Sequence, residues 1–275
     1  MSSQPFQLHT QIKGSGFPIL CLHGHPGSAE SLSVFTNPLS QKFQTIAPDL
    51  RGYGKSRYDR PFAMTEHIDD LTHLLDQHHI DQCLVLGWSL GGILAMELAL
   101  RLPARITGLI LVATAARPIS DHPAITGEDY LYTGIASIVN WFNPGWKLNI
   151  ELFGQRSLYR YLIQQHTTTA YEYLAREGLP AYLQTCKSAT SALNQALQKR
   201  YDRRHDLPNI QCPSLVLMGD CDRHITSASS LETAQALQNC QWHNYPNTAH
   251  LFPWEIPAQV ITDIDRWLQA KGYCI

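Results

Sequence analysis

Short apolar runs alternate along most of this chain with longer segments in which apolar residues recur at helical spacing. Each run is short enough for one strand and is bounded by turn-forming residues. The pattern predicts strands at 18–22, 43–47, 83–86, 106–113, 214–218 and 242–245, with one or two opening strands at 6–12. It predicts helices at 29–39, 65–79, 93–102, 227–237 and 256–270, the second of them capped by Thr65.

Strand and helix alternate in this order at both ends of the chain. Strands separated by a helix pair in parallel through right-handed crossovers, and parallel strands are buried on both faces. We therefore predict an α/β fold with a mostly parallel central sheet and helices on both faces.

Residues 117–205 interrupt the alternation, because they contain helical patterns and no clear strand-like run. Two turn-forming triplets, Asn143-Pro144-Gly145 and Gly178-Leu179-Pro180, are predicted to break these helices. The segment is rich in aromatic residues, most of which we expect to pack its own small core. The sequence thus predicts an α/β core formed by 1–116 and 206–275, and a helical insertion at 117–205 over the sheet edge where the loops cluster.

The composition is typical of a folded globular chain, with 44% hydrophobic and 16% charged residues among 275. A net charge of −2 gives no bulk attraction to nucleic acid or to an anionic membrane. The first seven residues show no signal-peptide pattern, and no apolar run approaches the roughly 20 residues of a membrane span. Seven scattered cysteines without a CxxC pair indicate reduced thiols. We therefore expect a cytoplasmic protein that binds neither nucleic acid nor membrane.

The most distinctive stretch is Leu84-Val85-Leu86-Gly87-Trp88-Ser89-Leu90-Gly91-Gly92, where an apolar run ends and a helical pattern begins. Ser89 lies between glycines two positions away on either side. A serine at the apex of such a strand-to-helix turn takes strained backbone angles, and glycines let strand and helix pass close together. The alternative is an ordinary glycine-rich loop, so the interpretation depends on the rest of the chain.

A serine nucleophile needs a base, and the base needs a group that holds its tautomer. In an α/β sheet these partners lie at the carboxyl ends of strands. Asp222 follows the predicted strand at 214–218, and His250 follows the strand at 242–245, so the chain order is Ser89, Asp222, His250. His224 is the rival base and Asp220 the rival acid. We favour Asp222, because Asp220 is nearer the strand and is suited to bracing the turn.

Backbone N–H groups are the expected donors to the oxyanion of a tetrahedral intermediate. The amide of Leu90 is one candidate, at the mouth of the helix after Ser89. The loop His23-Gly24-His25-Pro26-Gly27 offers a second, the amide of His25, since Pro26 has no N–H. We interpret the side chains of His23 and His25 as structural or pocket-lining groups and not as the base.

Five motifs together resemble the α/β-hydrolase superfamily, in its helical-cap branch of esterase-like, C–C-hydrolase-like and epoxide-hydrolase-like enzymes. They are HGHPGS at 23–28, DLRGYGKS at 49–56, GWSLGG at 87–92, GDCD at 219–222 and the AH…PWEIP segment around His250. The resemblance implies Ser89 as nucleophile, Asp222 as acid, His250 as base, and the amides of His25 and Leu90 as the oxyanion hole. It also implies a cap at about 117–205.

Two positions depart from relatives in this branch. Epoxide hydrolases and haloalkane dehalogenases place aspartate where this chain has Ser89, which argues against both activities. The residue before the base is often glycine, and here it is Ala249. No cluster of residues has metal-ligand spacing and no loop carries a P-loop lysine, so we expect neither a metal nor a cofactor.

These features predict a serine hydrolase that cleaves a small, mostly apolar ester or related acyl compound through an acyl-enzyme. A C–C bond hydrolase or lyase with the same triad is the first alternative. In such an enzyme Arg117, Arg156 and Arg160 could bind a carboxylate of the substrate, although we interpret these arginines as surface charges. A small-molecule receptor with vestigial hydrolysis is the second alternative.

The pattern leaves the oligomeric state open. We expect a substrate pocket that includes Trp88, His23, Trp141, Phe142 and Leu251.

Overall fold

The computed structural model describes residues 6–273. Most of the N-terminal stretch that bears on the signal peptide, and Cys274, lie outside this range. The six cysteines within it are free thiols.

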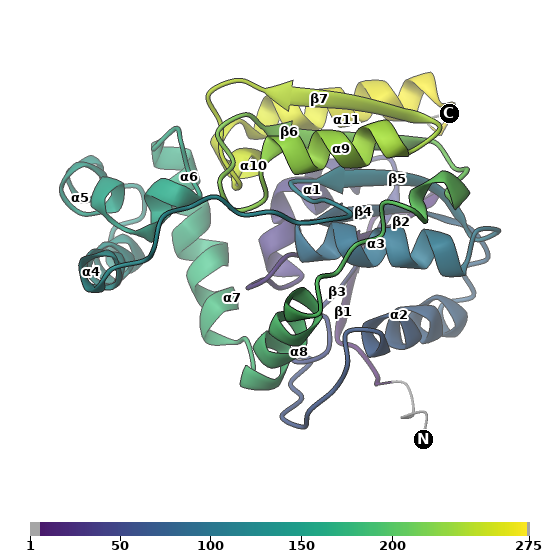
Figure 1. Ribbon diagram of the computed structural model, residues 1–275, viewed down its shortest axis with the longest axis horizontal. Coiled ribbons are helices and arrows are strands. Elements are labelled where there is room, and N and C mark those ends of the chain that lie inside the picture. The colour runs from purple at the N-terminus through teal and green to yellow at the C-terminus, as the bar shows by residue number, and fades with distance from the viewer. Residues whose placement is uncertain (1–5, 274–275) are drawn as a thin grey trace.

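Within residues 6–273, seven strands form one sheet in the order β1-β3-β2-β4-β5-β6-β7 (Figure 1). β1 pairs with β3 in antiparallel fashion, and every other neighbouring pair is parallel. The predicted mostly parallel sheet is therefore confirmed. The strands are β1 (Thr10–Lys13), β2 (Pro18–Leu22), β3 (Gln44–Pro48), β4 (Cys83–Trp88), β5 (Ile106–Val112), β6 (Ser214–Gly219) and β7 (Cys240–Tyr245).

Helices cover both faces of the sheet, as the alternation of strand and helix predicts (Figure 1). On one face lie α2 (Glu66–Gln77), α3 (Leu90–Arg101) and α9 (Ser227–Ala236). On the other lie α1 (Ser33–Leu39), which follows a 3₁₀ turn η1 (Glu30–Leu32), and α11 (Pro257–Ala270), which follows the short α10 (Phe252–Glu255).

Several element boundaries differ from the predicted ones. The opening strand begins only at Thr10, and α3 begins at Leu90 instead of Ile93. Thr65 does not cap α2, because its backbone is already helical (φ −63°, ψ −24°) and its side chain makes no capping hydrogen bond. Glu66 instead accepts a hydrogen bond from the amide of Ala63 at 2.9 Å, which ties the first turn of α2 to the preceding loop.

The segment between β5 and β6 contains helices and no strand within the described chain. A capping box between Thr126 and Asp129 starts the longest of them. Gly178-Leu179-Pro180 does not break the helices as predicted, because Pro180 lies in the first turn of α7, where its missing N–H costs no hydrogen bond. The helices are α4 (Gly127–Phe142), α5 (Lys147–Leu152), η2 (Gly154–Arg156), η3 (Leu158–Tyr161), α6 (Thr168–Tyr173), η4 (Leu174–Gly178), α7 (Leu179–Leu183) and α8 (Lys187–Gln198).

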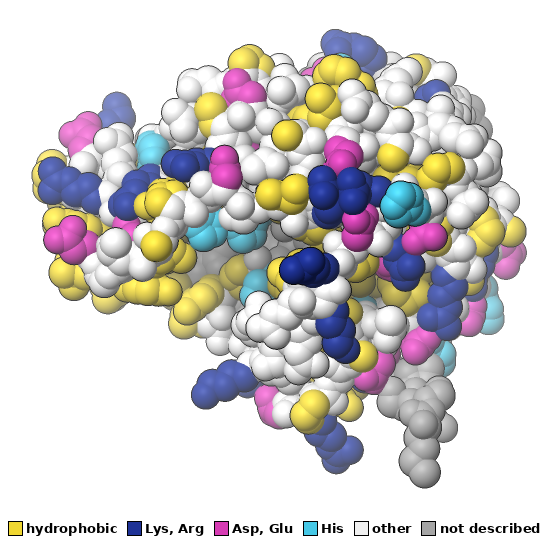
Figure 2. All heavy atoms as spheres, in the orientation of Figure 1, with side chains coloured by type: hydrophobic (Ala, Val, Ile, Leu, Met, Phe, Trp, Pro, Cys, Tyr) yellow, Lys and Arg dark blue, Asp and Glu magenta, His cyan; other side chains and the backbone are white. Residues whose placement is uncertain are grey.

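The outward face of α4 is apolar. Large side chains recur along it at helical spacing, and Phe142 at its end is 83% exposed; the others are Tyr130, Leu131, Ile138 and Trp141. Figure 2 shows hydrophobic side chains gathered along the edge of the lobe that α4 and α5 form. These large side chains are therefore exposed on the surface of the helical segment and do not pack in its interior.

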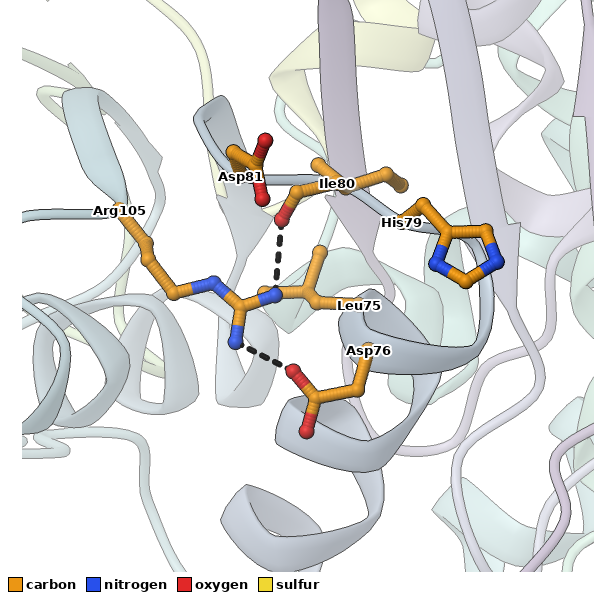
Figure 3. Close-up of a pocket in the computed structure, with 6 residues that line it drawn as sticks. All are labelled: Leu75, Asp76, His79, Ile80, Asp81 and Arg105. Atoms are coloured by element: carbon orange, nitrogen blue, oxygen red, sulfur yellow. Dashed lines mark hydrogen bonds and ion pairs between the residues drawn. The ribbon is translucent and has the colours of Figure 1, made fainter.

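A small hollow of about 360 Å³ lies at the amino ends of β4 and β5 (Figure 3). Arg105 lines this hollow, and its guanidinium donates hydrogen bonds to the carbonyl of Ile80 at 2.7 Å and to Asp76 at 2.6 Å. The loops that carry candidate chemistry lie at the opposite, carboxyl edge of the sheet. We therefore interpret this hollow as a structural junction between α2 and the sheet.

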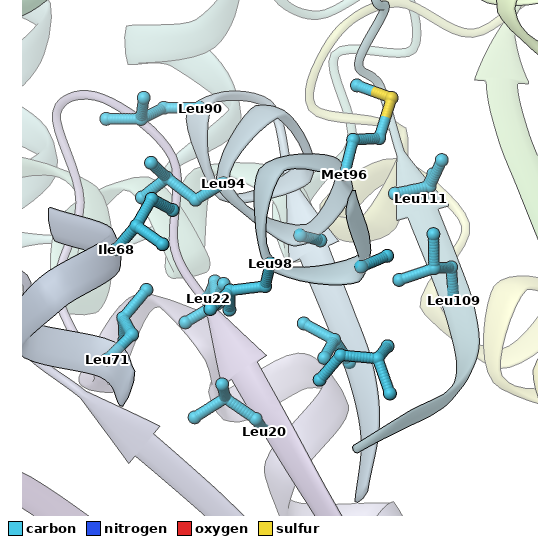
Figure 4. Close-up of a cluster of buried hydrophobic side chains, with 14 of the residues drawn as sticks. Leu20, Leu22, Ile68, Leu71, Leu90, Leu94, Met96, Leu98, Leu109 and Leu111 are labelled. Carbon is cyan, nitrogen blue, oxygen red and sulfur yellow. The ribbon is translucent and has the colours of Figure 1, made fainter. Parts of the chain in front are cut away.

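The core beneath those loops is built from strand residues that alternate between the two faces. Leu20 and Leu22 of β2 pack toward α2 and α3, whereas Ile19 and Cys21 pack toward α1 and α11. Figure 4 shows the first cluster, with leucines of β2 and β5 against α2 and α3. Because β4 is buried along its whole length, the turn that follows it is held on a rigid base.

Candidate active site

Ser89 lies at the turn between β4 and α3 with φ 53° and ψ −115°. A non-glycine residue with positive φ persists only where its surroundings hold it. The amide of Ser89 donates to Val112 at 2.8 Å, and the hydroxyl of Thr114 donates to the carbonyl of Ser89 at 2.8 Å. A side chain at Gly87 would clash with the carbonyl of Gly91, so the strand and helix require glycine to pass this closely.

Three side chains from separate loops meet above this turn. His250 Nε2 lies 3.1 Å from Ser89 Oγ, and His250 Nδ1 lies 2.8 Å from Asp222 Oδ2. Each of the three is less than 10% exposed. The structure thus brings together the serine, acid and histidine that the sequence singles out, in one hydrogen-bonded chain.

Backbone amides fix the acid. Asp222 Oδ1 accepts hydrogen bonds from the amides of His224 at 2.8 Å and Ile225 at 3.0 Å, which leaves Oδ2 directed at His250. Asp220 instead accepts from the amide of Thr248 at 3.3 Å, within the loop that precedes His250. Asp222, and not Asp220, therefore contacts the histidine.

The imidazole of His224 lies edge-on to that of His250, with ring centroids 4.6 Å apart. Burial, followed by the neighbouring His250, lowers the pKa of His224 to about 3. Its ring makes no hydrogen bond to another residue of the described chain. His224 is thus a neutral neighbour of the histidine at neutral pH and not its substitute.

Two backbone amides border the serine turn. Leu90 is the first residue of α3, so its N–H has no partner within the helix. A side chain at Gly24 would lie 3.1 Å from Ser89 Cβ, so the loop after β2 rests against the serine, with His25 as its next residue. The arrangement leaves the N–H groups of Leu90 and His25 as candidate oxyanion donors.

The side chains of His23 and His25 take structural roles in this loop. His23 Nε2 accepts from the amide of Leu50 at 3.0 Å, so its proton is on Nδ1, which donates to Gly24 at 2.8 Å. His25 Nδ1 bonds the hydroxyl of Tyr53 at 2.9 Å. Burial, followed by His23, lowers the pKa of His25 to about 4.

A cavity of about 600 Å³ opens above Ser89 at the carboxyl edge of the sheet. Figure 2 shows it as a hollow bordered by histidine side chains, with a basic side chain beside it. Within 117–205, the two ends of the segment contribute to its wall and the helices α4–α7 do not. The lining residues are His25, Ser89, Leu90, Ile93, Arg117, Pro118, Ile119, Ser120, His122, Leu193, Asn194, Leu197, Arg200, Tyr201, Asp202, His224 and Ile225.

None of the five predicted pocket residues lines this cavity, so that prediction is corrected. Trp88 alternates to the opposite face of the sheet, where its ring packs against two other aromatic rings. His23 is fully buried in its own loop, and Leu251 packs against the core beneath α10. Trp141 and Phe142 lie on the exposed face of α4. Helical periodicity shows that aromatics share a face but not what the face contacts.

The sequence analysis missed two functional candidates, Arg200 and Glu255, and assigned Arg117 to the surface. Arg117, interpreted as a surface charge, lines the cavity, as does Arg200. Glu255 is buried and accepts hydrogen bonds from the amides of Ala249 at 2.9 Å and Gln165 at 2.6 Å. The only signal for Glu255 in the local sequence is that a charged residue stands within a short apolar segment. The local sequence around Arg117 and Arg200 gives no such signal.

Residues 6–273 contain neither a cluster of side chains suited to a metal ion nor a helix suited to a membrane span. No group of three or more histidine, cysteine, aspartate or glutamate side chains in this range could hold a metal ion. No helix in it is both long enough and apolar enough to cross a membrane.

Comparison with known proteins places these motifs among enzymes. The family model for the alpha/beta hydrolase fold matches residues 18–257. The human serine hydrolase BPHL (Homo sapiens) is 30% identical over 226 residues, 78% of this chain and 67% of that protein. The pimeloyl-[acyl-carrier protein] methyl ester esterase of Nitrosospira multiformis is 25% identical over 94% of this chain and 97% of its own. A thermophilic esterase from Thermogutta terrifontis superposes with a TM-score of 0.71 at 26% identity, covering 96% of this chain and 93% of that one.

Proposed function

The chain belongs to the alpha/beta hydrolase fold family and is an esterase-like serine hydrolase, and from that premise we propose that Ser89, His250 and Asp222 cleave small, mostly apolar esters. One observation carries the proposal: the continuous hydrogen-bonded chain from Ser89 Oγ through both nitrogens of His250 to Asp222. This arrangement is what activation of a serine hydroxyl requires.

In the proposed first step, His250 Nε2 takes the proton from Ser89 Oγ as the oxygen attacks the ester carbonyl. Asp222 accepts a hydrogen bond from Nδ1–H of His250, which keeps Nε2 free to act as the base and stabilises the imidazolium that forms. The two amides that already hold Asp222 Oδ1 support this role, because they fix the acid before substrate arrives.

The amides of His25 and Leu90 are proposed to bind the oxyanion, each contributing roughly 3 kcal/mol to stabilisation of the transition state. The position of Leu90 at the start of α3 supports this, since helix N-termini favour negative charge. His250 then gives its proton to the leaving alcohol. Water hydrolyses the acyl-enzyme with His250 again as base, and the free acid leaves Ser89.

The cavity wall supports an apolar substrate, because Ile93, Ile119 and Leu197 lie along it. We propose that residues 117–205 act as a cap, since both ends of that segment contribute to the wall. Two similar proteins are named as esterases, which supports an ester as the substrate over other acyl compounds. The free thiols of the six cysteines within residues 6–273 support a reducing, cytoplasmic setting.

The test is turnover of a p-nitrophenyl acyl ester by the Ser89→Ala variant. We expect kcat to fall by about a millionfold, the loss that follows removal of a triad serine. The matched control is Ser15→Ala, an exposed serine in the turn between β1 and β2, which should keep the wild-type rate. Full turnover by Ser89→Ala would refute the assignment.

A panel of substrates separates the alternatives. Multiple rapid turnovers on esters, with none on vinylogous diketo-acids, are expected for the proposed esterase. The reverse preference would identify a C–C bond hydrolase. A single slow turnover, together with a ligand-induced rise in melting temperature, would identify a receptor.

A further inference from the structure

The wall of the cavity above Ser89 carries formal charges as well as apolar groups. Arg117, Arg200 and Asp202 line it beside the leucines of α8. Charged groups lose hydration when a substrate covers them, so a cavity meant only for neutral chains gains nothing from an uncompensated charge. A charged side chain without an ion-pair partner in the protein would therefore favour a substrate of opposite charge.

Most of the charges around the cavity are paired with one another. Arg117 Nη2 lies 3.1 Å from Glu232, and Arg204 contacts both Glu232 at 2.8 Å and Asp202 at 2.7 Å. Hydrogen bonds from Arg204 lower the pKa of Asp202 to about 2, so this acid is ionised. These two arginines and two carboxylates form a neutral cluster.

The histidines His25 and His224 add no positive charge to the cavity near neutral pH. Burial is the main cause in both cases, and it lowers the pKa of His25 to about 4 and of His224 to about 3.

Arg200 has no such compensation. Its guanidinium makes no hydrogen bond or ion pair to any other residue in the described part of the chain. Its backbone is fixed, because φ is 58° and its amide donates to Leu197 at 2.9 Å just after the end of α8. Arg200 is exposed, and its unneutralised side chain extends from this fixed backbone position at the wall of the cavity that contains Ser89.

We infer that the substrate is an ester whose acyl chain ends in a carboxylate, and that Arg200 binds this carboxylate at the cavity wall while Ser89 attacks the ester. The inference rests on the proposed function. A guanidinium presents planar N–H donors that match the two oxygens of a carboxylate. Leu193 and Leu197 lie one helical turn apart on α8 and line the wall that the intervening methylene groups contact.

The experiment compares monomethyl adipate with methyl hexanoate, which has the same acyl length but no carboxylate. We expect the wild-type enzyme to show a kcat/KM about tenfold higher for monomethyl adipate, the size of one partly exposed charge-assisted contact. Raising the ionic strength should reduce this preference, because salt screens exposed charges. Arg200→Met should abolish the preference, and Arg200→Lys should restore part of it.

The matched control is Lys199→Met, which removes the neighbouring cation that does not line the cavity and should keep the preference. Loss of the preference in Lys199→Met would show that net charge, and not Arg200, carries it. 6-Acetoxyhexanoate carries its carboxylate on the alcohol side. An Arg200-dependent preference for this ester over monomethyl adipate would overturn the acyl-side assignment.

Failure of this inference is distinguishable from failure of the proposed function. A wild-type enzyme that hydrolyses both methyl esters equally well overturns the inference and leaves the esterase intact. If neither ester is hydrolysed, calorimetric binding of monomethyl adipate to Ser89→Ala still tests Arg200. Equal affinity with and without Arg200→Met in that background would overturn the inference.

Discussion

At the scale of single residues, backbone amides decide which of two neighbouring acids faces the histidine. Asp220 and Asp222 lie two positions apart, and both are carboxylates in the same loop. Amides of the following turn hold one oxygen of Asp222 and leave the other for His250, whereas Asp220 is engaged by Thr248. Local hydrogen bonding thus separates a candidate catalytic acid from a structural one.

The first prediction concerns this pair. Asp222→Asn should lower kcat by about four orders of magnitude, because an amide in this position favours the wrong tautomer of His250. Asp220→Asn should leave kcat near the wild-type value, since the amide oxygen still accepts from Thr248. Steady-state kinetics on one ester measure both variants. Equal losses in the two would contradict the assignment of Asp222 as the acid.

At the scale of elements, α10 connects the histidine loop to the helical segment. Glu255 at the end of α10 accepts from the amide of Ala249, next to His250, and from the amides of Gln164 and Gln165. The amide of Leu251 also donates to the carbonyl of Leu162 at 2.8 Å. The position of His250 therefore depends on the segment at 162–165, which lies outside the sheet.

A second prediction tests this connection. Glu255→Gln replaces one acceptor oxygen with an N–H₂ group, so at least one buried amide loses its partner. We expect a loss of about 1–3 kcal/mol in the free energy of unfolding and a lower kcat, measured by urea denaturation and ester kinetics. Gln165→Ala is the matched control, since it keeps the backbone donor and removes only the side-chain bond to Asn247. A destabilised Glu255→Gln with wild-type kcat would show that Glu255 does not position His250.

At the scale of the whole molecule, a buried neutral histidine contributes to the dependence of stability on pH. His67 is fully buried, and neither ring nitrogen has a hydrogen-bond partner within the described residues. Burial, followed by His23 and Arg51, lowers the pKa of His67 to about 3. In the unfolded chain an ordinary histidine has a pKa of about 6.5, so between these values the unfolded state binds more protons. The contribution of His67 to stability is therefore fully present above pH 6.5 and is lost as the pH is lowered toward 3.

A third prediction follows for His67→Phe. Each buried neutral histidine contributes a slope of up to about 1.4 kcal/mol per pH unit on the acid side. The variant should lose most of one such contribution, so its free energy of unfolding should fall less steeply than that of the wild type between about pH 6.5 and 4. Urea denaturation across this range measures the slope. His78→Gln, at an exposed position, should keep the wild-type slope, and an unchanged slope in His67→Phe would refute the argument.

The sequence by itself determined that the sheet is mostly parallel and covered on both faces, because strands separated by helices pair in parallel and are buried on both sides, with Leu20 and Ile19 on opposite faces. It also predicted the turn at Ser89, because glycines flank the serine at the spacing the close passage of strand and helix requires. Only the tertiary structure decided which residues line the cavity above that serine and which brace the histidine loop. Arg200, Glu255 and the exposed face of α4 depend on how loops and helices pack over the sheet, and that packing brings together residues far apart in sequence without any local periodic signal.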